Sequence, residues 1–306
     1  MEFVGLQTQI WRNNTRSLLL LIMFPVLLLV MQWAMLFAFY RKREKYVIQH
    51  VNDIWLDTAP YVLAATAIWF VIAWLYHSSM IQSATGARPL ERSDDMRVYN
   101  LLENLCISRG VPMPKLYVLE DESLNAYASG ISERSFAITV SRGMLNKLND
   151  AELEGVLAHE LTHILNRDVR LLIVSIIFTG IFSFIAQLML RGGSRGGSKK
   201  ETGTVIFVML IVLVAWMISV IMQFAISRKR EYMADAGAVM LTKNGPALAS
   251  ALEKIAGDPT IESVHRSDVA QLFIHHPKVG GNMSFFNKLF GTHPPIEERI
   301  EILRAW

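Results

Sequence analysis

Four long stretches of the sequence carry no charged side chain, and they cover residues 18–40, 58–77, 171–190 and 204–226. A helix needs about 20 residues to cross the roughly 30 Å of hydrocarbon in a membrane, and each stretch reaches that length. One such helix could form the core of a large soluble protein, but four would leave too little polar chain to surround them in 306 residues. With 52% hydrophobic and 19% charged residues, the sequence predicts a mainly α membrane protein with four transmembrane helices.

The composition also excludes several classes of protein. The single cysteine, Cys106, rules out an internal disulfide and a cysteine-based zinc cluster within one chain. A net charge of +3, without a basic run interleaved with aromatic residues, argues against nucleic acid as a partner. The first apolar stretch is too long for a removable signal peptide, so we expect it to remain as an anchor. Basic residues flank the stretches on both sides, so charge alone does not decide the orientation in the membrane.

The long polar segment between the second and third stretches predicts a small domain of mixed structure. Apolar residues recur at helical spacing over residues 94–108, and Gly110 then ends this helix. Asn149, with Glu152 three residues later, has the form of a capping box that opens a helix over residues 151–168. Three short runs rich in β-branched and aromatic residues predict a small sheet, and they cover residues 115–119, 124–129 and 136–141.

Two histidines lie one turn apart on the helix predicted over residues 151–168. His159 and His163 are four residues apart, which puts them about 40° apart on one helix face, close enough to bind one metal ion. Imidazoles are good ligands for Zn²⁺, and the carboxylate of the adjacent Glu160 can take a proton from water bound to the ion. This H-E-x-x-H arrangement arises by chance in roughly one chain in a hundred of this length. Its place on a capped helix just before an apolar stretch favours zinc binding over an ordinary surface helix.

A catalytic zinc site needs a third protein ligand and keeps its fourth position open. The metzincin class is excluded because the positions that would hold its glycine and histidine are Asn166 and Val169. The third and fourth apolar stretches predict a hairpin, which places His163 about 12 Å before the membrane and Glu231 about 7 Å after it. Glu231 is therefore favoured, and the other candidates are Asp235, His265, His275, His276 and His293.

Asp235 lies four residues after Glu231 and faces the same way on a helix. It could accept the outward N–H of a ligating histidine, which would orient the ring and raise its basicity. A competing interpretation treats the charged residues 228–231 as a solvated cluster beside the membrane.

Three further residues have two interpretations each. His293 precedes a helix predicted over residues 296–304, with proline in its first turn. This histidine could stabilise the oxyanion of a tetrahedral intermediate, or it could only cap and orient that helix. Asp168 and Arg299 either support the metal site or form a structural pair, and the structural interpretation is favoured. The remaining histidines of the C-terminal part are interpreted as surface residues.

Five segments carry a resemblance to a known family, and they read SATGARPL at 83–90, LNAYASG at 124–130, VLAHELTHILNRD at 156–168, SRKREYMADAGA at 227–238 and THPPIEERIEIL at 292–303. In these segments the sequence resembles the HtpX family of membrane zinc metalloproteases, which is related to the CAAX prenyl proteases. The resemblance implies that His159, His163 and Glu231 bind one zinc ion per chain and that Glu160 is the general base. It also implies a catalytic domain on the cytoplasmic side of a bacterial inner membrane.

The resemblance further implies polypeptide substrates. Residues 124–129 look like the family's substrate-side strand, in which Asn125, Ala126, Tyr127 and Ala128 would bind substrate and Tyr127 stands where phenylalanine is common. An extended peptide would pair with the edge of such a strand. The family's role implies quality control of misfolded or damaged membrane proteins in a stress response.

These observations predict an N-terminal region of two transmembrane helices (1–77), a catalytic domain in two parts (78–170 and 227–306) and an intervening transmembrane hairpin (171–226). The catalytic domain is expected to have a gluzincin-type α+β metalloprotease fold. The predicted function is that of a zinc metalloendopeptidase. The alternative is a non-catalytic membrane scaffold or holdase with a structural zinc, which would need a closed four-ligand site and would have no use for Glu160. A transporter is disfavoured because the apolar stretches contain no charged residue to mark an ion path.

Overall fold

The structure is a computed structural model that describes residues 6–41, 44–170, 173, 228–257 and 295–306. The predicted third and fourth membrane spans lie outside these residues, apart from residue 173. The predictions for the linker between those spans, and for His265, His275, His276 and His293, also fall outside them.

The chain divides into two compact units. One, the hairpin unit, contains Thr15–Leu75 and Val174–Gln223, and the other, the α/β unit, contains Met1–Asn14, Tyr76–Ile173 and Phe224–Trp306. Each unit has its own architecture.

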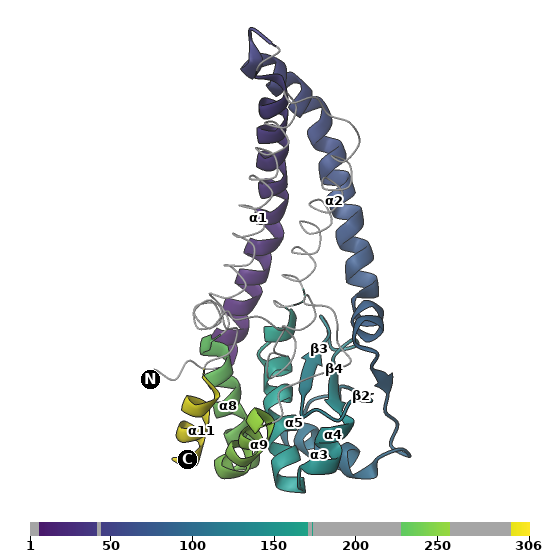
Figure 1. Ribbon diagram of the computed structural model, residues 1–306, viewed down its shortest axis with the longest axis vertical. Coiled ribbons are helices and arrows are strands. Elements are labelled where there is room, and N and C mark those ends of the chain that lie inside the picture. Colours follow the sequence, from purple (N-terminus) through teal and green to yellow (C-terminus); the bar gives the residue numbers. More distant parts are fainter. Residues whose placement is uncertain (1–5, 42–43, 171–172, 174–227, 258–294) are drawn as a thin grey trace. The chain divides into compact units, whose positions relative to one another are not determined.

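Two long apolar helices make up the described part of the hairpin unit (Figure 1). Helix α1 covers Leu6–Tyr40 and helix α2 covers Val47–Thr85, and each contains a stretch long and apolar enough to cross a membrane. The expected spans at 18–40 and 58–77 are thus confirmed as such helices. Both helices run further into polar sequence than expected. Helix α2 ends at Thr85, and the next residue, Gly86, has a φ of 73° that favours glycine.

Polar side chains connect α1 and α2 within this unit. Gln32 Nε2 donates to Thr58 Oγ1 at 2.7 Å, and Trp33 Nε1 donates to Asn52 Oδ1 at 2.8 Å. The pairing of early residues of α2 with late residues of α1 makes the two helices antiparallel. Hydrogen bonds of this kind help to hold helices together in hydrocarbon, where the hydrophobic effect between helices is absent.

A four-stranded mixed sheet forms one layer of the α/β unit, with strand order β1-β2-β4-β3. The strands are β1 (Arg88–Pro89), β2 (Lys115–Leu119), β3 (Ala126–Ser129) and β4 (Ala137–Ser141). Strands β2 and β4 are parallel, and the β1–β2 and β3–β4 pairs are antiparallel. The predicted small sheet is confirmed, but β1 was not expected because a two-residue strand has no periodicity. Among the described strands, β3 has a partner on one side only.

Local capping signals set the helices of this unit. Helix α3 (Met96–Arg109) begins after Asp95, which accepts from Val98 N–H, and stops at Gly110 in the left-handed conformation. Helix α5 (Asp150–Leu165) starts with the predicted capping box of Asn149 and Glu152. The buried Glu152 carboxylate also accepts hydrogen bonds from Ser250 and Lys254 of helix α9 (Gly245–Gly257), so the start of α5 is tied to α9.

Helix α5 lies between the sheet and helices α8 and α9 (Figure 1). Helix α8 (Arg228–Thr242) crosses α5 very closely at Gly237. A Cβ placed on this glycine would lie 2.3 Å from Thr162 Cγ2, so the crossing leaves no room for a side chain there. The last helix, α11 (Ile296–Arg304), packs on α8 and α9 and matches the helix expected at 296–304. The crossing at Gly237 therefore fixes how near α8 comes to the helix that carries both histidines.

We predict that Gly237→Ala destabilises the protein by about 1–3 kcal/mol, because the new methyl group overlaps the Thr162 side chain. Adding Thr162→Ala removes the overlapping atoms and should recover part of the loss. Thermal unfolding of the full chain in detergent measures both effects. Gly257→Ala is the matched control, since a Cβ there meets nothing within 4 Å. Equal losses in the two glycine variants would contradict a close crossing of α8 and α5.

Candidate metal centre and the elements that build it

Helix α5 brings the two motif histidines together in the interior of the α/β unit. His159 and His163 point their Nε2 atoms toward each other, 3.2 Å apart. His159 is only 1% exposed and the His163 side chain 13%, so the pair is withdrawn from solvent but still reachable on the His163 side.

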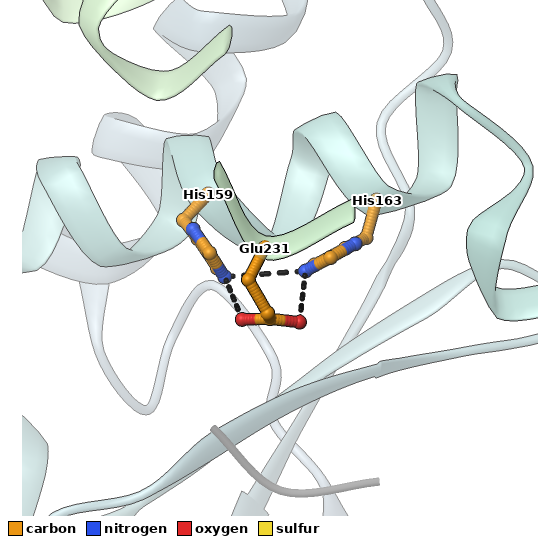
Figure 2. Close-up of side chains that lie close together, drawn as sticks. All are labelled: His159, His163 and Glu231. Atoms are coloured by element: carbon orange, nitrogen blue, oxygen red, sulfur yellow. Dashed lines mark hydrogen bonds and ion pairs between the residues drawn. The ribbon is translucent and has the colours of Figure 1, made fainter. Parts of the chain in front are cut away.

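Glu231 from α8 faces both rings (Figure 2). Its Oε2 lies 3.6 Å from His159 Nε2, and its Oε1 lies 3.5 Å from His163 Nε2. One donor atom from each of the three residues lies within 4.8 Å of the others, a spacing that could hold a metal ion. Two neutral imidazoles and a carboxylate are a donor set that suits zinc in catalytic sites. Of the two third-ligand candidates that the described residues include, Glu231 and Asp235, it is therefore Glu231 whose carboxylate faces both rings.

Two more carboxylates contact the outer nitrogens of the rings. Asp235 Oδ1 lies 2.9 Å from His159 Nδ1, and Asp168 Oδ2 lies 3.1 Å from His163 Nδ1. A carboxylate that accepts from Nδ1–H fixes the tautomer and leaves the Nε2 lone pair for a ligand. The contact of Asp235 with a histidine is the one that its position after Glu231 predicts.

The position of Asp168 follows from an early end of α5. The helix stops at Leu165 instead of continuing to residue 168, and Arg167 adopts a left-handed conformation with φ of 59°. On an unbroken helix, a residue five positions after His163 would lie about 140° away from it. The turn brings Asp168 back to the histidine, a local feature that the helical pattern of the sequence does not reveal.

Arg299 on α11, near the C-terminus, also contacts the cluster. It is 1% exposed, and its Nε and Nη2 donate to the two oxygens of Asp235 at 2.8 and 2.7 Å. Its Nη1 lies 3.3 Å from Glu231 Oε2. The sequence left two roles open for Asp168 and Arg299, support of the site or a structural pair, and favoured the second. The structure places Asp168 against His163 and Arg299 against Asp235 and Glu231.

Glu160 is buried beside the histidines and close to β3. Burial raises the pKa of this carboxyl above its usual value, and the charges of His159 and His163 and a backbone hydrogen bond from Ala128 oppose that shift. A carboxyl with a raised pKa is better matched to accept and return a proton near neutral pH.

The backbone of β3 presents alternate residues to its outer edge. Ser141 N–H donates to the carbonyl of Asn125 at 2.9 Å, so Asn125 and Tyr127 face β4, and Ala126 and Ala128 face outward. The amide of Ala126 donates to the side-chain oxygen of Asn125 at 3.0 Å.

The Tyr127 side chain points into the core instead of toward this edge. It is 1% exposed, and its hydroxyl lies 2.9 Å from Thr85 Oγ1 at the end of α2. Of the predicted substrate-binding residues, Ala126 and Ala128 thus have backbone groups on the outer edge, while the Tyr127 ring packs inside.

The two acidic neighbours of His159 strongly affect its protonation in the metal-free protein. Burial lowers the pKa of His159, but its close contacts with the carboxylates of Asp235 and Glu231 outweigh burial and raise the pKa to about 9. A metal ion would therefore have to compete with a proton at this ring.

Comparison with known proteins supplies the family. Residues 92–306 match Peptidase family M48, a family of metallopeptidases. The Protease HtpX homolog of Bacteroides fragilis is 50% identical over 322 aligned positions, which cover 100% of both chains. The Protease HtpX homolog of Lactobacillus helveticus is 32% identical over 310 positions (97% of this chain, 99% of the relative), and that of Tropheryma whipplei is 36% identical over 250 positions (80% and 84%).

The chain therefore belongs to the HtpX family of membrane metalloproteases within peptidase family M48. The resemblance found in the sequence is confirmed. The crystal structure of S. mikatae Ste24p is also similar, with a TM-score of 0.44 and 19% identity, covering 96% of this chain and 66% of that one. A likeness at that level carries no weight in the assignment.

We predict that the metal-free protein loses stability as the pH rises through about 9. The folded state raises the pKa of His159 from 6.5 to about 9, so its contribution to stability is full below pH 6.5 and disappears above pH 9. Asp235→Asn removes the first carboxylate that raises this pKa and should flatten the pH dependence. Unfolding temperatures in excess chelator, compared across this pH range, measure the effect. Glu301→Gln, at an exposed position on α11, should keep the dependence of the unmodified protein.

Proposed function

We propose that this membrane protease is a zinc-dependent endopeptidase whose zinc ligands are His159, His163 and Glu231 and whose general base is Glu160. The observation that carries the proposal is the convergence of the two Nε2 atoms and the Glu231 carboxylate within 4.8 Å, with Glu160 next to them in the sequence. The donor set fits zinc, and the carboxylates of Asp235 and Asp168 orient the rings for it.

When bound, a zinc ion supplies Lewis acidity that lowers the pKa of water and polarises a peptide carbonyl. Glu160 takes a proton from the attacking water as the water oxygen bonds to the carbonyl carbon. It then gives that proton to the leaving amine as the carbon–nitrogen bond breaks. Burial favours this cycle because it raises the pKa of Glu160 and so lowers the cost of holding the proton between the two steps.

A non-catalytic scaffold with a structural zinc is the competing function. Such a site would be closed by four protein ligands and would gain nothing from a buried carboxylate at position 160. Glu160 is 3% exposed in a cluster that already contains other carboxylates, a costly arrangement for a purely structural site. The role of His293 as an oxyanion donor or as a structural residue stays a prediction, since this residue lies outside the part of the chain that the structure describes.

Glu160→Gln should abolish cleavage of an unfolded protein such as casein and leave zinc binding in place. Loss of a general base typically costs about 10²–10⁴-fold in rate. The measurement is caseinolysis by the full chain in detergent with zinc restored, together with zinc stoichiometry. Glu154→Gln, on the same helix but away from the cluster, is the matched control and should cleave normally.

Equal cleavage by the parent and Glu160→Gln proteins, or none by either, would remove the endopeptidase proposal. Glu231→Ala should lower the zinc content. An unchanged zinc content in that variant would show that Glu231 is not the third ligand.

We infer that substrate binds as an extended strand along the outer edge of β3. Ala126 and Ala128 turn their backbone groups to that edge, and the amide of Ala128 hydrogen bonds to Glu160. A peptide on this edge would donate alternate N–H groups to the carbonyls of these two residues. The side chain of Asn125 already accepts from the Ala126 amide, which leaves the carbonyl groups as the natural partners of a substrate.

N-methylation of a cleavable peptide tests this edge pairing. Methyl groups on the alternate amides that face β3 should lower kcat/KM by roughly tenfold for each lost hydrogen bond, whereas methyl groups on the intervening amides should have much smaller effects. Peptides methylated at single positions on both sides of the scissile bond give the comparison. A uniform effect at all positions would argue against pairing as a strand.

The proposed substrates are misfolded or damaged membrane proteins in a bacterial inner membrane, with the α/β unit on the cytoplasmic side. This part of the proposal rests on the family's role in stress-linked quality control and on the two apolar helices of the chain. A destabilised membrane protein should have a shorter half-life than its stable parent in cells with the active protease. The difference should shrink in cells with the Glu160→Gln protein, and an unchanged difference would oppose the proposal.

A further inference from the structure

Arg299 is a buried cation in direct contact with two acidic groups of the metal centre. We propose that Arg299 is a positioning residue that holds Glu231 and Asp235 in the orientation needed to bind the metal. The inference rests on the proposed zinc site and deepens it, because it assigns the orientation of two residues on α8 to a side chain from α11.

The guanidinium uses separate edges for its two partners. One edge, made by Nε and Nη2, pairs with both oxygens of Asp235 at 2.8 and 2.7 Å. The remaining nitrogen, Nη1, lies 3.3 Å from Glu231 Oε2. Asp235 also contacts His159 Nδ1 at 2.9 Å. Arg299 is therefore linked directly to one proposed ligand, Glu231, and through Asp235 to another, His159.

The two carboxylates need a positive charge between them. Glu231 and Asp235 are one turn apart on the same face of α8, and both are nearly inaccessible to solvent, at 4% and 3%. Two buried like charges at this spacing repel each other, and without a cation between them the side chains would turn apart. Arg299 offsets that repulsion because its guanidinium contacts both carboxylates, which holds the two side chains facing the histidines.

Lysine could supply the charge but not the geometry. A guanidinium is planar, and it can bind one carboxylate through two nitrogens and still donate to another group. An ammonium is a point charge on a flexible stem, so it cannot hold both carboxylates in fixed orientations. Arg299→Lys therefore separates the effect of charge from the effect of orientation.

Docking of α11 does not depend on Arg299 alone. Tyr232 on α8 donates to Glu298 on α11 at 2.8 Å, and Arg304 on α11 pairs with Glu253 on α9. These contacts are exposed and do not reach the cluster. They provide variants that loosen α11 without touching the metal centre.

The test is the affinity of the detergent-purified full chain for Zn²⁺, measured by competition with a chromophoric chelator. Replacing a residue that orients a ligand typically weakens metal binding by about 10–100-fold. We expect a loss within this range for Arg299→Gln and a smaller but clear loss for Arg299→Lys. Arg304→Gln, on the same helix, and Glu298→Gln should keep the affinity of the parent protein. Circular dichroism and unfolding temperature establish that each variant is folded.

Three results would overturn the proposal. The first is a folded Arg299→Gln protein that binds and releases zinc as the parent does. The second is an equal loss of affinity in Glu298→Gln, which would assign the effect to docking of α11. The third applies if Arg299→Gln does not fold: a folded Arg299→Lys protein that binds zinc as tightly as the parent would then overturn the proposal. Failure of the parent protein itself to bind zinc would instead contradict the proposed function.

Discussion

The close crossing of α8 over α5 is the contact on which the candidate metal centre depends. The centre is built from residues 159–163 and residue 231, which are far apart in the sequence, and only the packing of these two helices makes them neighbours. Gly237 permits this approach because a side chain there would overlap Thr162. Glu231 lies six residues before Gly237 on the same helix. The contact between Gly237 and Thr162 that packs α8 on α5 therefore also brings the Glu231 carboxylate close to the histidines.

The cost of burying charge explains why groups of opposite charge lie so close together around the centre. An isolated carboxylate or imidazolium in a protein interior loses several kcal/mol of hydration, so each charged group needs a partner of opposite sign or a hydrogen bond. His159, Asp235, Arg299 and Glu231 form a closed ring of such contacts. The side chains of the candidate metal centre thus face one another without a metal ion, an arrangement that would lower the cost of ordering them on binding.

The sequence predicts the local features of this fold well and the long-range ones poorly. The capping box of Asn149 and Glu152, the three main strands and the metal motif follow from spacing within a few residues, and the structure contains each of them. The choice of Glu231 among distant candidates needed the argument that a membrane hairpin returns the chain to the same side. The structure brings Glu231 to the histidines. The hairpin predicted from the third and fourth apolar stretches lies outside the described residues, apart from residue 173.

Arg299 and Tyr127 show why the sequence alone could not decide between two roles for some residues or the direction of others. Nothing in the pattern of α11 distinguishes a buried arginine from a surface one, because its partners lie more than sixty positions earlier. Tyr127 sits in a strand expected to face a substrate, but alternate side chains of a strand point to opposite faces, and the direction of each was not assigned from the sequence. Asp168 was obscured by a single left-handed residue that ends a helix whose apolar pattern continues.

Helix α2 continues beyond its apolar stretch, and its last residues, from Tyr76 on, belong to the α/β unit. Its end is joined to the sheet by the contact between Thr85 and Tyr127, and Ile81 is buried one turn earlier. The end of the apolar stretch of this helix is therefore not the border of the folded α/β unit. A shortened version that started at the first strand would lose Ile81 and the Thr85 partner of the Tyr127 hydroxyl, so a cut that keeps both has to be made within the helix itself, upstream of Tyr76.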